Sequence, residues 1–312
     1  MNVSLNVLRA ACVAAAAVVL AACGGGQQVE PFAPTRVLAF GDEASVIDGV
    51  GRKYTVNAVV AGGTALECKT NPNWVQSLAS AYGLVFPECN PDAVPAPSSR
   101  ILAVPGAKVA DLQVQIDAFV AGGGSFSAKD LVTIWAGQGD IKALYDSYPG
   151  VGEADLVAAA EQAGRVVAGQ VNRIAEAGGK VLIATVPDVG LTPFATAEKA
   201  AHSDIDRAAL LSRLSRRLNA KLLIGLIDDG HKIGLLQADS LVQAVVKSPL
   251  PNGFFNATES VCTVALPDCT TLTLREGTSG DSYLWADALQ FSAGGHKSLG
   301  NLASTRAHNN PF

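Results

Sequence analysis

Short apolar runs rich in valine, isoleucine and leucine alternate with longer stretches of helical periodicity along most of this chain. Strands buried on both faces are near-continuous apolar runs, and their alternation with helices is typical of a parallel sheet covered on both sides. The expected buried strands are residues 36–40, 131–135, 180–186 and 222–227. The expected helices are residues 73–82, 109–120, 155–177 and 195–219. This pattern predicts one large α/β domain, since no charged or low-complexity break divides the chain.

Three short blocks stand out against this pattern. FGDEASV at 40–46 begins at the end of the first expected strand, and WAGQGDI at 135–141 begins at the end of the second. A third block, YLWADALQF at 283–291, lies near the C-terminus. Ligand sites in parallel sheets lie beyond the carboxyl ends of the strands. We therefore expect the first two blocks to meet in one crevice.

In order, spacing and flanks these blocks resemble the GDSL or SGNH hydrolase family, whose first block reads FGDSLSD, third GxND and last DxxH. Four further segments resemble the lipases and haemolysin-like esterases of that family: NWVQ with YGL at 73–84, AVPGA at 103–107, PDVGLTP at 187–193 and GFFN at 253–256. The resemblance covers nearly the whole chain after its N-terminus. It implies a three-layer α/β/α sandwich with a mostly parallel, five-stranded, flavodoxin-like sheet, and the hydrolysis of esters by a serine nucleophile.

The residues that carry this chemistry in the family are replaced here. Glu43 stands where the family keeps its nucleophilic serine, Gly139 where it keeps the oxyanion-hole asparagine, and Gln290 where it keeps the catalytic histidine. Gly106 falls on the glycine whose N–H helps to form the oxyanion hole. Asp287 falls on the carboxylate that orients the histidine.

These replacements remove the groups that an esterase needs, which are a hydroxyl nucleophile, a base and donors for the oxyanion. Glu43 has no hydroxyl, and Gln290 cannot take up and return a proton near neutral pH as histidine does. Gly139 lacks a side-chain amide donor, a group worth about 3 kcal/mol in comparable sites. We therefore expect a pseudoenzyme that acts as a binding or structural module.

The alternative is an active ester hydrolase with relocated catalytic residues. Ser45 and His296 could replace the lost nucleophile and base, although both also suit a structural role. A second form of the alternative pairs Glu43 with Asp287 as acid and base, as paired carboxylates do in glycoside hydrolysis. Asp42 and Asp140 would lie in the same crevice, but they resemble family residues that hydrogen-bond the backbone.

The N-terminus predicts export and a lipid anchor. Arg9 precedes an apolar run at 10–20, which is too short to span a bilayer as a mature helix and is typical of a signal peptide. The following LAAC resembles the bacterial lipobox, in which Cys23 is acylated; an ordinary signal cleaved elsewhere is the alternative. The expected parts are a lipoprotein signal peptide at 1–22, a lipidated flexible tether at 23–34 and the SGNH hydrolase-like domain at 35–312. Glycine after Cys23 resembles lipoproteins sent to the outer membrane.

The four cysteines beyond the tether predict two disulfides, since an even number in an exported protein favours bridges. Three pairings are possible. We favour the local one, Cys68 with Cys89 and Cys262 with Cys269, because both pairs lie in Pro-, Asn- and Thr-rich stretches that are typical of loops. A zinc site is the competing idea, but the spacing and the scarcity of nearby histidines disfavour it, so no metal is expected.

Charge and composition limit the partners. The 23 basic and 28 acidic residues give a formal net charge of −5, and no basic patch is visible, which disfavours nucleic acid. No cofactor is expected. The expected partner is a membrane, reached through the N-terminal lipid, and the resemblance implies an acyl or glycan ligand.

The lipobox-like LAAC predicts that Cys23 is acylated. Labelled palmitate should be incorporated into the wild-type protein, and Cys23→Ser should release the protein from the membrane fraction or trap its precursor. Absence of label on the wild type would refute an anchor at this residue.

Overall fold

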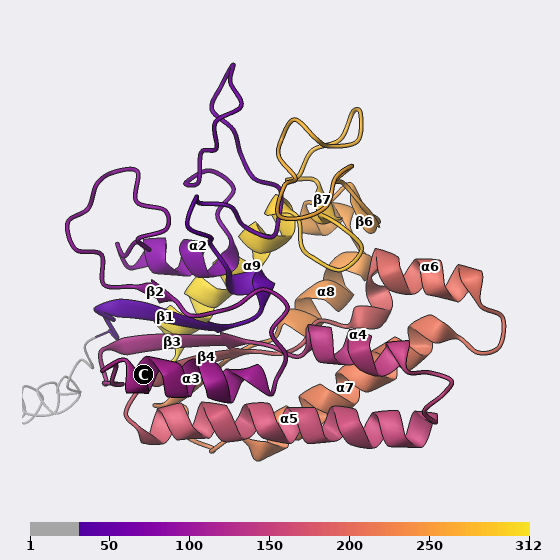
Figure 1. Ribbon diagram of the computed structural model, residues 1–312, viewed down its shortest axis with the longest axis horizontal. Helices are drawn as coiled ribbons and strands as arrows, with labels where there is room; N and C mark the ends of the chain where they lie inside the picture. The colour runs from indigo at the N-terminus through magenta and orange to yellow at the C-terminus, as the bar shows by residue number, and fades with distance from the viewer. Residues whose placement is uncertain (1–30) are drawn as a thin grey trace, which may run out of the picture. The chain divides into compact units, whose positions relative to one another are not determined.

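The computed structural model describes residues 31–312, and a five-stranded parallel sheet forms the centre of this part of the chain (Figure 1). The strands are β1 (Arg36–Gly41), β2 (Arg100–Ile101), β3 (Asp130–Trp135), β4 (Lys180–Ala184) and β5 (Ile233–Leu236). They lie in the order β2-β1-β3-β4-β5, and every pairing is parallel. This is the strand order of flavodoxin-like, doubly wound sheets.

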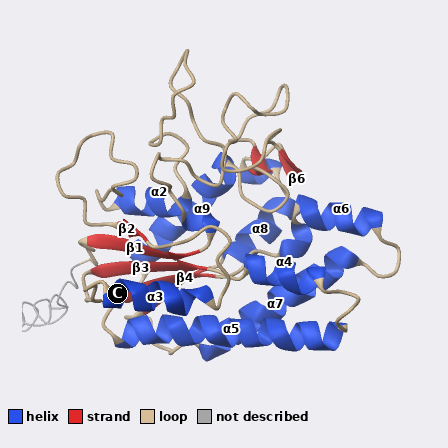
Figure 2. Cartoon of the chain, viewed as in Figure 1, coloured by secondary structure: helices blue, strands red, loops and turns tan. Residues whose placement is uncertain are grey.

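Helices cover both faces of the sheet (Figures 1 and 2). One face carries α3 (Asp111–Ala121) and α5 (Glu153–Glu176), and the other carries α2 (Trp74–Ala81) and α9 (Ala293–Asn309). The remaining helices of the described chain are α4 (Gln138–Asp146), α6 (Pro193–Ala201), α7 (Arg207–Gly225) and α8 (Ala238–Lys247), with 3-10 turns η1 (Glu43–Ser45), η2 (Val189–Leu191) and η3 (Leu250–Asn252). The predicted three-layer α/β/α sandwich is confirmed.

Strand side chains alternate between the two layers, as the period of two requires. Leu38 and Phe40 of β1 pack with Val132 and Ile134 of β3 in the core shared with α3 and α5. Trp135 points the other way, where its ring meets those of Trp74 on α2 and Phe291 before α9. The sheet is therefore apolar on both faces, which explains its continuous apolar strands.

Two sequence predictions in the second half of the chain are wrong. Residues 195–219 do not form one helix, because Asp206 caps the start of a new helix by accepting a hydrogen bond from Ala209 N–H. Residues 222–227 do not form a strand. Leu218 and Leu222 are instead buried on one side of α7, and the fifth strand is β5. A short apolar run does not by itself distinguish a strand from the end of a buried helix.

Two disulfides fasten the loops above the sheet. Cys68 is bonded to Cys89, and Cys262 to Cys269, which is the local pairing that we favoured. The second bridge lies in the segment between β6 (Asn256–Ser260) and β7 (Tyr283–Trp285), which pair with each other in parallel.

Residues 33–312 form one unit by their internal contacts. The predicted signal peptide at 1–22, Cys23 and most of the tether at 23–34 lie outside the described residues. Among the residues that are described, no helix has the length and apolar character needed to cross a membrane.

A buried lysine joins two of the loops. The Lys53 side chain has no exposed surface, and its Nζ donates hydrogen bonds to the carbonyl oxygens of Cys68 (2.6 Å) and Thr70 (3.3 Å). Burial lowers the pKa of Lys53 to about 8, against a weaker, opposing effect of Glu67. The ammonium group is therefore held in the fold at some cost in stability.

Lys53 predicts that stability rises between about pH 8 and pH 10.5. The folded protein loses this proton near a pKa of about 8, whereas the unfolded chain keeps it until about 10.5, so the unfolded state binds more protons in this window. The expected gain in the free energy of unfolding is about 3 kcal/mol, measured by urea unfolding. Lys53→Met should lose this part of the pH dependence, and an unchanged profile would contradict the assignment.

Candidate active-site crevice

The crevice begins where β1 ends. Gly41 has a φ of +124°, and a Cβ added there would lie 1.8 Å from the carbonyl oxygen of Trp135, so only glycine fits. This close approach lets the chain turn at the end of β1, beside the end of β3, and Asp42 N–H bonds to the same Trp135 carbonyl at 3.0 Å. Gln115 from α3 holds the corner, since its side-chain amide bonds to both the N–H and the C=O of Gly41. Glu43 follows in η1.

The Glu43 carboxylate joins three segments that are distant in sequence. Its Oε2 accepts a hydrogen bond from Gly106 N–H at 2.9 Å, and its Oε1 accepts one from Gln290 Nε2 at 2.8 Å. Glu43 is half-buried, and Gln290 is only 7% exposed. The structure thus brings together Glu43, Gly106 and Gln290, three of the residues that the sequence comparison singled out. Each oxygen of the carboxylate accepts one hydrogen bond, one from Gly106 and one from Gln290.

Gly106 is held beside Glu43 by the loop after β2. Val104 N–H donates to the carbonyl of Gly41 at 3.0 Å, and Ala107 N–H donates to the carbonyl of Val104 at 3.1 Å. Gly106 adopts a φ of +74°, in the left-handed region that favours glycine, and turns its N–H toward Glu43.

Asp287 organises the loop that carries Gln290. Its Oδ1 accepts the backbone N–H groups of Leu289 (2.8 Å) and Gln290 (2.6 Å), and burial raises its pKa. Gln138, at the start of α4, donates from Nε2 to the carbonyl of Leu289 at 2.7 Å and so fixes the loop from the other side. Asp287 therefore fixes the backbone of the loop at Leu289 and Gln290.

Gly139 lies in the first turn of α4 on an open side of the crevice. A Cβ at this position would approach only the carbonyl oxygen of Ala107, at 3.8 Å, an ordinary contact. The neighbouring Asp140 accepts a hydrogen bond from Val109 N–H at 2.9 Å, and burial raises its pKa. The site therefore has room for a larger side chain at 139.

Asp42 is the most deeply buried carboxylate of the group, with 3% of its surface exposed. Its Oδ1 accepts Ala44 N–H at 3.1 Å and caps η1. Burial, and then the negative charge of Glu43, hold the pKa of Asp42 well above its usual range. Asp42, Asp140 and Asp287 thus each bond a backbone N–H of a neighbouring turn or loop.

Ser45 and His296, the two candidate replacements for the lost nucleophile and base, lie in the core instead of the crevice. Ser45 has no exposed surface, and its Oγ accepts a hydrogen bond from the indole N–H of Trp74 at 3.2 Å. His296 is 1% exposed, and its Nδ1 accepts Trp74 backbone N–H at 3.3 Å. Burial, followed by the nearby charge of Lys53, lowers the pKa of His296 to about 3. Both side chains support α2, and a histidine with this pKa is a weak base at neutral pH.

Within residues 31–312 no cluster of three or more histidine, cysteine, aspartate or glutamate side chains is arranged to hold a metal ion. Gln115 and Gln138 are the site residues that the sequence analysis missed. Gln115 lies in the middle of α3 and Gln138 begins α4, and glutamine side chains give no pattern by which their carbonyl and amide partners could have been found.

No protein-family model matches the sequence, and no curated protein matches it. Among solved structures, the chain is similar to a lipase from a goat rumen metagenome (14% identity, TM-score 0.49), with 89% of this chain and 99% of the lipase covered. It is also similar to an acetylxylan esterase from Geobacillus stearothermophilus (13%, TM-score 0.43, 89% and 96% covered). A third similar structure is phospholipase A1 from Streptomyces albidoflavus (15%, TM-score 0.43, 88% and 98% covered).

Proposed function

We propose that this chain is a catalytically silent relative of the GDSL or SGNH esterases, anchored by a lipid at Cys23 and acting as a binding or structural module of the bacterial envelope. The observation that carries the proposal is the contact of the Glu43 carboxylate with Gly106 N–H and Gln290 Nε2.

This contact matches the geometry of an occupied oxyanion hole. A working esterase aims its donors at an oxygen that becomes negative only in the transition state, at about 2.7–3.1 Å. Here an oxygen of the protein's own Glu43 carboxylate lies 2.9 Å from the Gly106 nitrogen, without any substrate bound. A substrate carbonyl would have to displace it, and would then develop negative charge beside another negative group. Glu43 therefore opposes ester hydrolysis in two ways: it has no hydroxyl nucleophile, and its carboxylate occupies the Gly106 N–H that would stabilise an oxyanion.

The position of Gln290 supports the same proposal. Its amide nitrogen donates to Glu43, whereas a catalytic base must accept a proton from the nucleophile and return it. Asp287 accepts the backbone N–H groups of Leu289 and Gln290, so the loop keeps a defined place without an imidazole to orient. The scaffold of the crevice is retained without the reacting groups.

Relocated catalysis by Ser45 and His296 is not favoured by their surroundings. Each side chain bonds to Trp74, and neither is accessible to a substrate. Carboxylate chemistry by Glu43 with Asp287 is equally unsupported, since the Asp287 carboxylate accepts two backbone N–H groups in its own loop. The proposed role is therefore binding, with an acyl or glycan ligand as the resemblance implies, at the outer membrane.

Rebuilding the three lost groups tests the proposal. Wild-type protein should hydrolyse p-nitrophenyl acetate no faster than Glu43→Ala, because neither has a hydroxyl at 43. The triple variant Glu43→Ser, Gly139→Asn, Gln290→His should hydrolyse the ester measurably, since position 139 has room for the amide. Its matched control is the same variant with alanine in place of serine at 43. A displacement of about 1 Å in the rebuilt groups would cost on the order of a hundredfold.

Two results bear against the proposal. Wild-type turnover clearly above the Glu43→Ala variant would make Glu43 a reacting group. Labelling of wild-type protein at Ser45 by a fluorophosphonate probe would establish relocated serine chemistry.

A further inference from the structure

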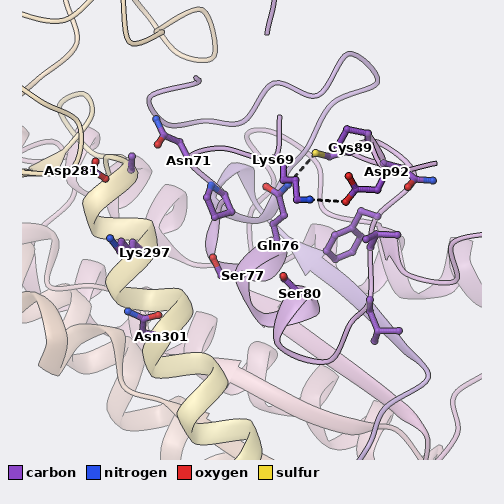
Figure 3. Close-up of a pocket in the computed structure, with 17 residues that line it drawn as sticks. Lys69, Asn71, Gln76, Ser77, Ser80, Cys89, Asp92, Asp281, Lys297 and Asn301 are labelled. Atoms are coloured by element: carbon purple, nitrogen blue, oxygen red, sulfur yellow. Dashed lines mark hydrogen bonds and ion pairs between the residues drawn. The ribbon is translucent and has the colours of Figure 1, made fainter. Parts of the chain in front are cut away.

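A hollow of about 530 Å³ lies between α2, α9 and the loop closed by the Cys68–Cys89 disulfide (Figure 3). None of its lining residues belongs to the crevice at Glu43. A second hollow of about 190 Å³ adjoins it and shares Asp281, Lys297 and Asn301 with it. The larger hollow has the size of a small-molecule binding pocket, and the pair offers room for a ligand that continues along α9.

A buried acceptor in the wall has no partner. Gln76 Nε2 donates to the carbonyl of Cys68 at 3.0 Å and contacts Cys89 Sγ at 3.1 Å, which fixes the orientation of the amide. Its Oε1 is then left buried without a hydrogen-bond partner in the described part of the chain. This oxygen has almost no accessible surface, so a ligand in the hollow does not reach it, and the Gln76 amide serves to fix the wall beside the disulfide.

The charges that line the hollow balance. Lys69 is paired with Asp92 at 2.6 Å on the rim (Figure 3). Lys297 on α9 and Asp281 before it carry opposite charges, and neither makes an ion pair within residues 31–312. Anions would meet the carboxylate of Asp281, and cations the ammonium of Lys297. The wall thus supplies strong donors and acceptors without selecting for a net charge.

The rest of the wall combines apolar and hydroxyl surfaces. Pro72, Leu84 and Val85 are partly buried and supply apolar contact, while Ser77 and Ser80 of α2 supply hydroxyls. An acyl chain would leave the polar atoms of this wall unpaired. A sugar ring presents C–H groups on its faces and hydroxyls that both donate and accept at its edges. We propose that the two hollows bind a neutral oligosaccharide, with its hydroxyls bonded to Lys297 and Asn301, which line both hollows.

Titration calorimetry with the full-length protein in detergent tests this site. The probes are cellopentaose, xylopentaose and chitopentaose, with tetra-alanine as a neutral peptide of similar length. At least one sugar should bind with a Kd below about 1 mM. Lys297→Ala and Asn301→Leu should each weaken that binding by about fivefold, the loss expected for one hydrogen bond. Both side chains are exposed, so these variants should fold.

Matched controls separate the hollow from the rest of the surface. Ser80→Trp should fill the hollow and abolish binding, whereas Ser240→Trp on α8 should leave it unchanged. Lys247→Ala is the corresponding control for Lys297→Ala; Ser240 and Lys247 are exposed on α8 and line neither hollow. The proposal is overturned if no sugar binds, if Ser80→Trp binds as well as wild type, or if tetra-alanine binds as tightly as the best sugar.

Discussion

The hydrogen bonds from Gly106 N–H and Gln290 Nε2 to the Glu43 carboxylate connect the turn after β1, the loop after β2 and the loop before α9. They depend on the close approach of Gly41 to Trp135, which sets where residue 43 lies. A serine there would present a short hydroxyl and leave the Gly106 N–H for an oxyanion. Glutamate is longer and brings its own negative oxygen to that donor. In the proposed function the same contact stabilises the crevice and keeps it unreactive.

Most of the fold could be predicted because the parallel sheet is buried on both faces. The runs that became β1, β3 and β4 are mostly apolar, as strands covered on both faces are. β2 was missed because its two residues, Arg100 and Ile101, form no pattern at all. The end of α7 resembled a strand because the apolar residues at 222–227 follow one another closely. Only Leu222 of this run is fully buried, in the core shared with α5, whereas Leu223 and Ile224 are exposed; such one-sided helix packing is not visible in a short window.

The crevice could be placed from the sequence, but its internal bonds could not. Residues 40–45 and 135–140 each follow the carboxyl end of an expected parallel strand, which predicts that they meet at one edge of the sheet. The pairing of Gly41 with Trp135 confirms this. No pattern indicates that the Glu43 carboxylate turns onto Gly106 and Gln290, because that depends on side-chain rotamers and on loops fixed by Gln115 and Gln138. Ser45 and His296 were candidate replacements for the lost nucleophile and base that also suited a structural role, and their burial around Trp74 became visible only when α2 and α9 were placed together.

The central claim is that the Glu43 carboxylate occupies the donor of Gly106, and the amide resonance of Gly106 reports on that contact directly. A ¹H–¹⁵N correlation spectrum of the ¹⁵N-labelled protein would measure it. We expect the Gly106 amide proton to lie downfield in the wild type, because it donates to a carboxylate oxygen at 2.9 Å, and to move upfield in Glu43→Ala. A Gly106 amide at the same position in wild type and Glu43→Ala would contradict the account.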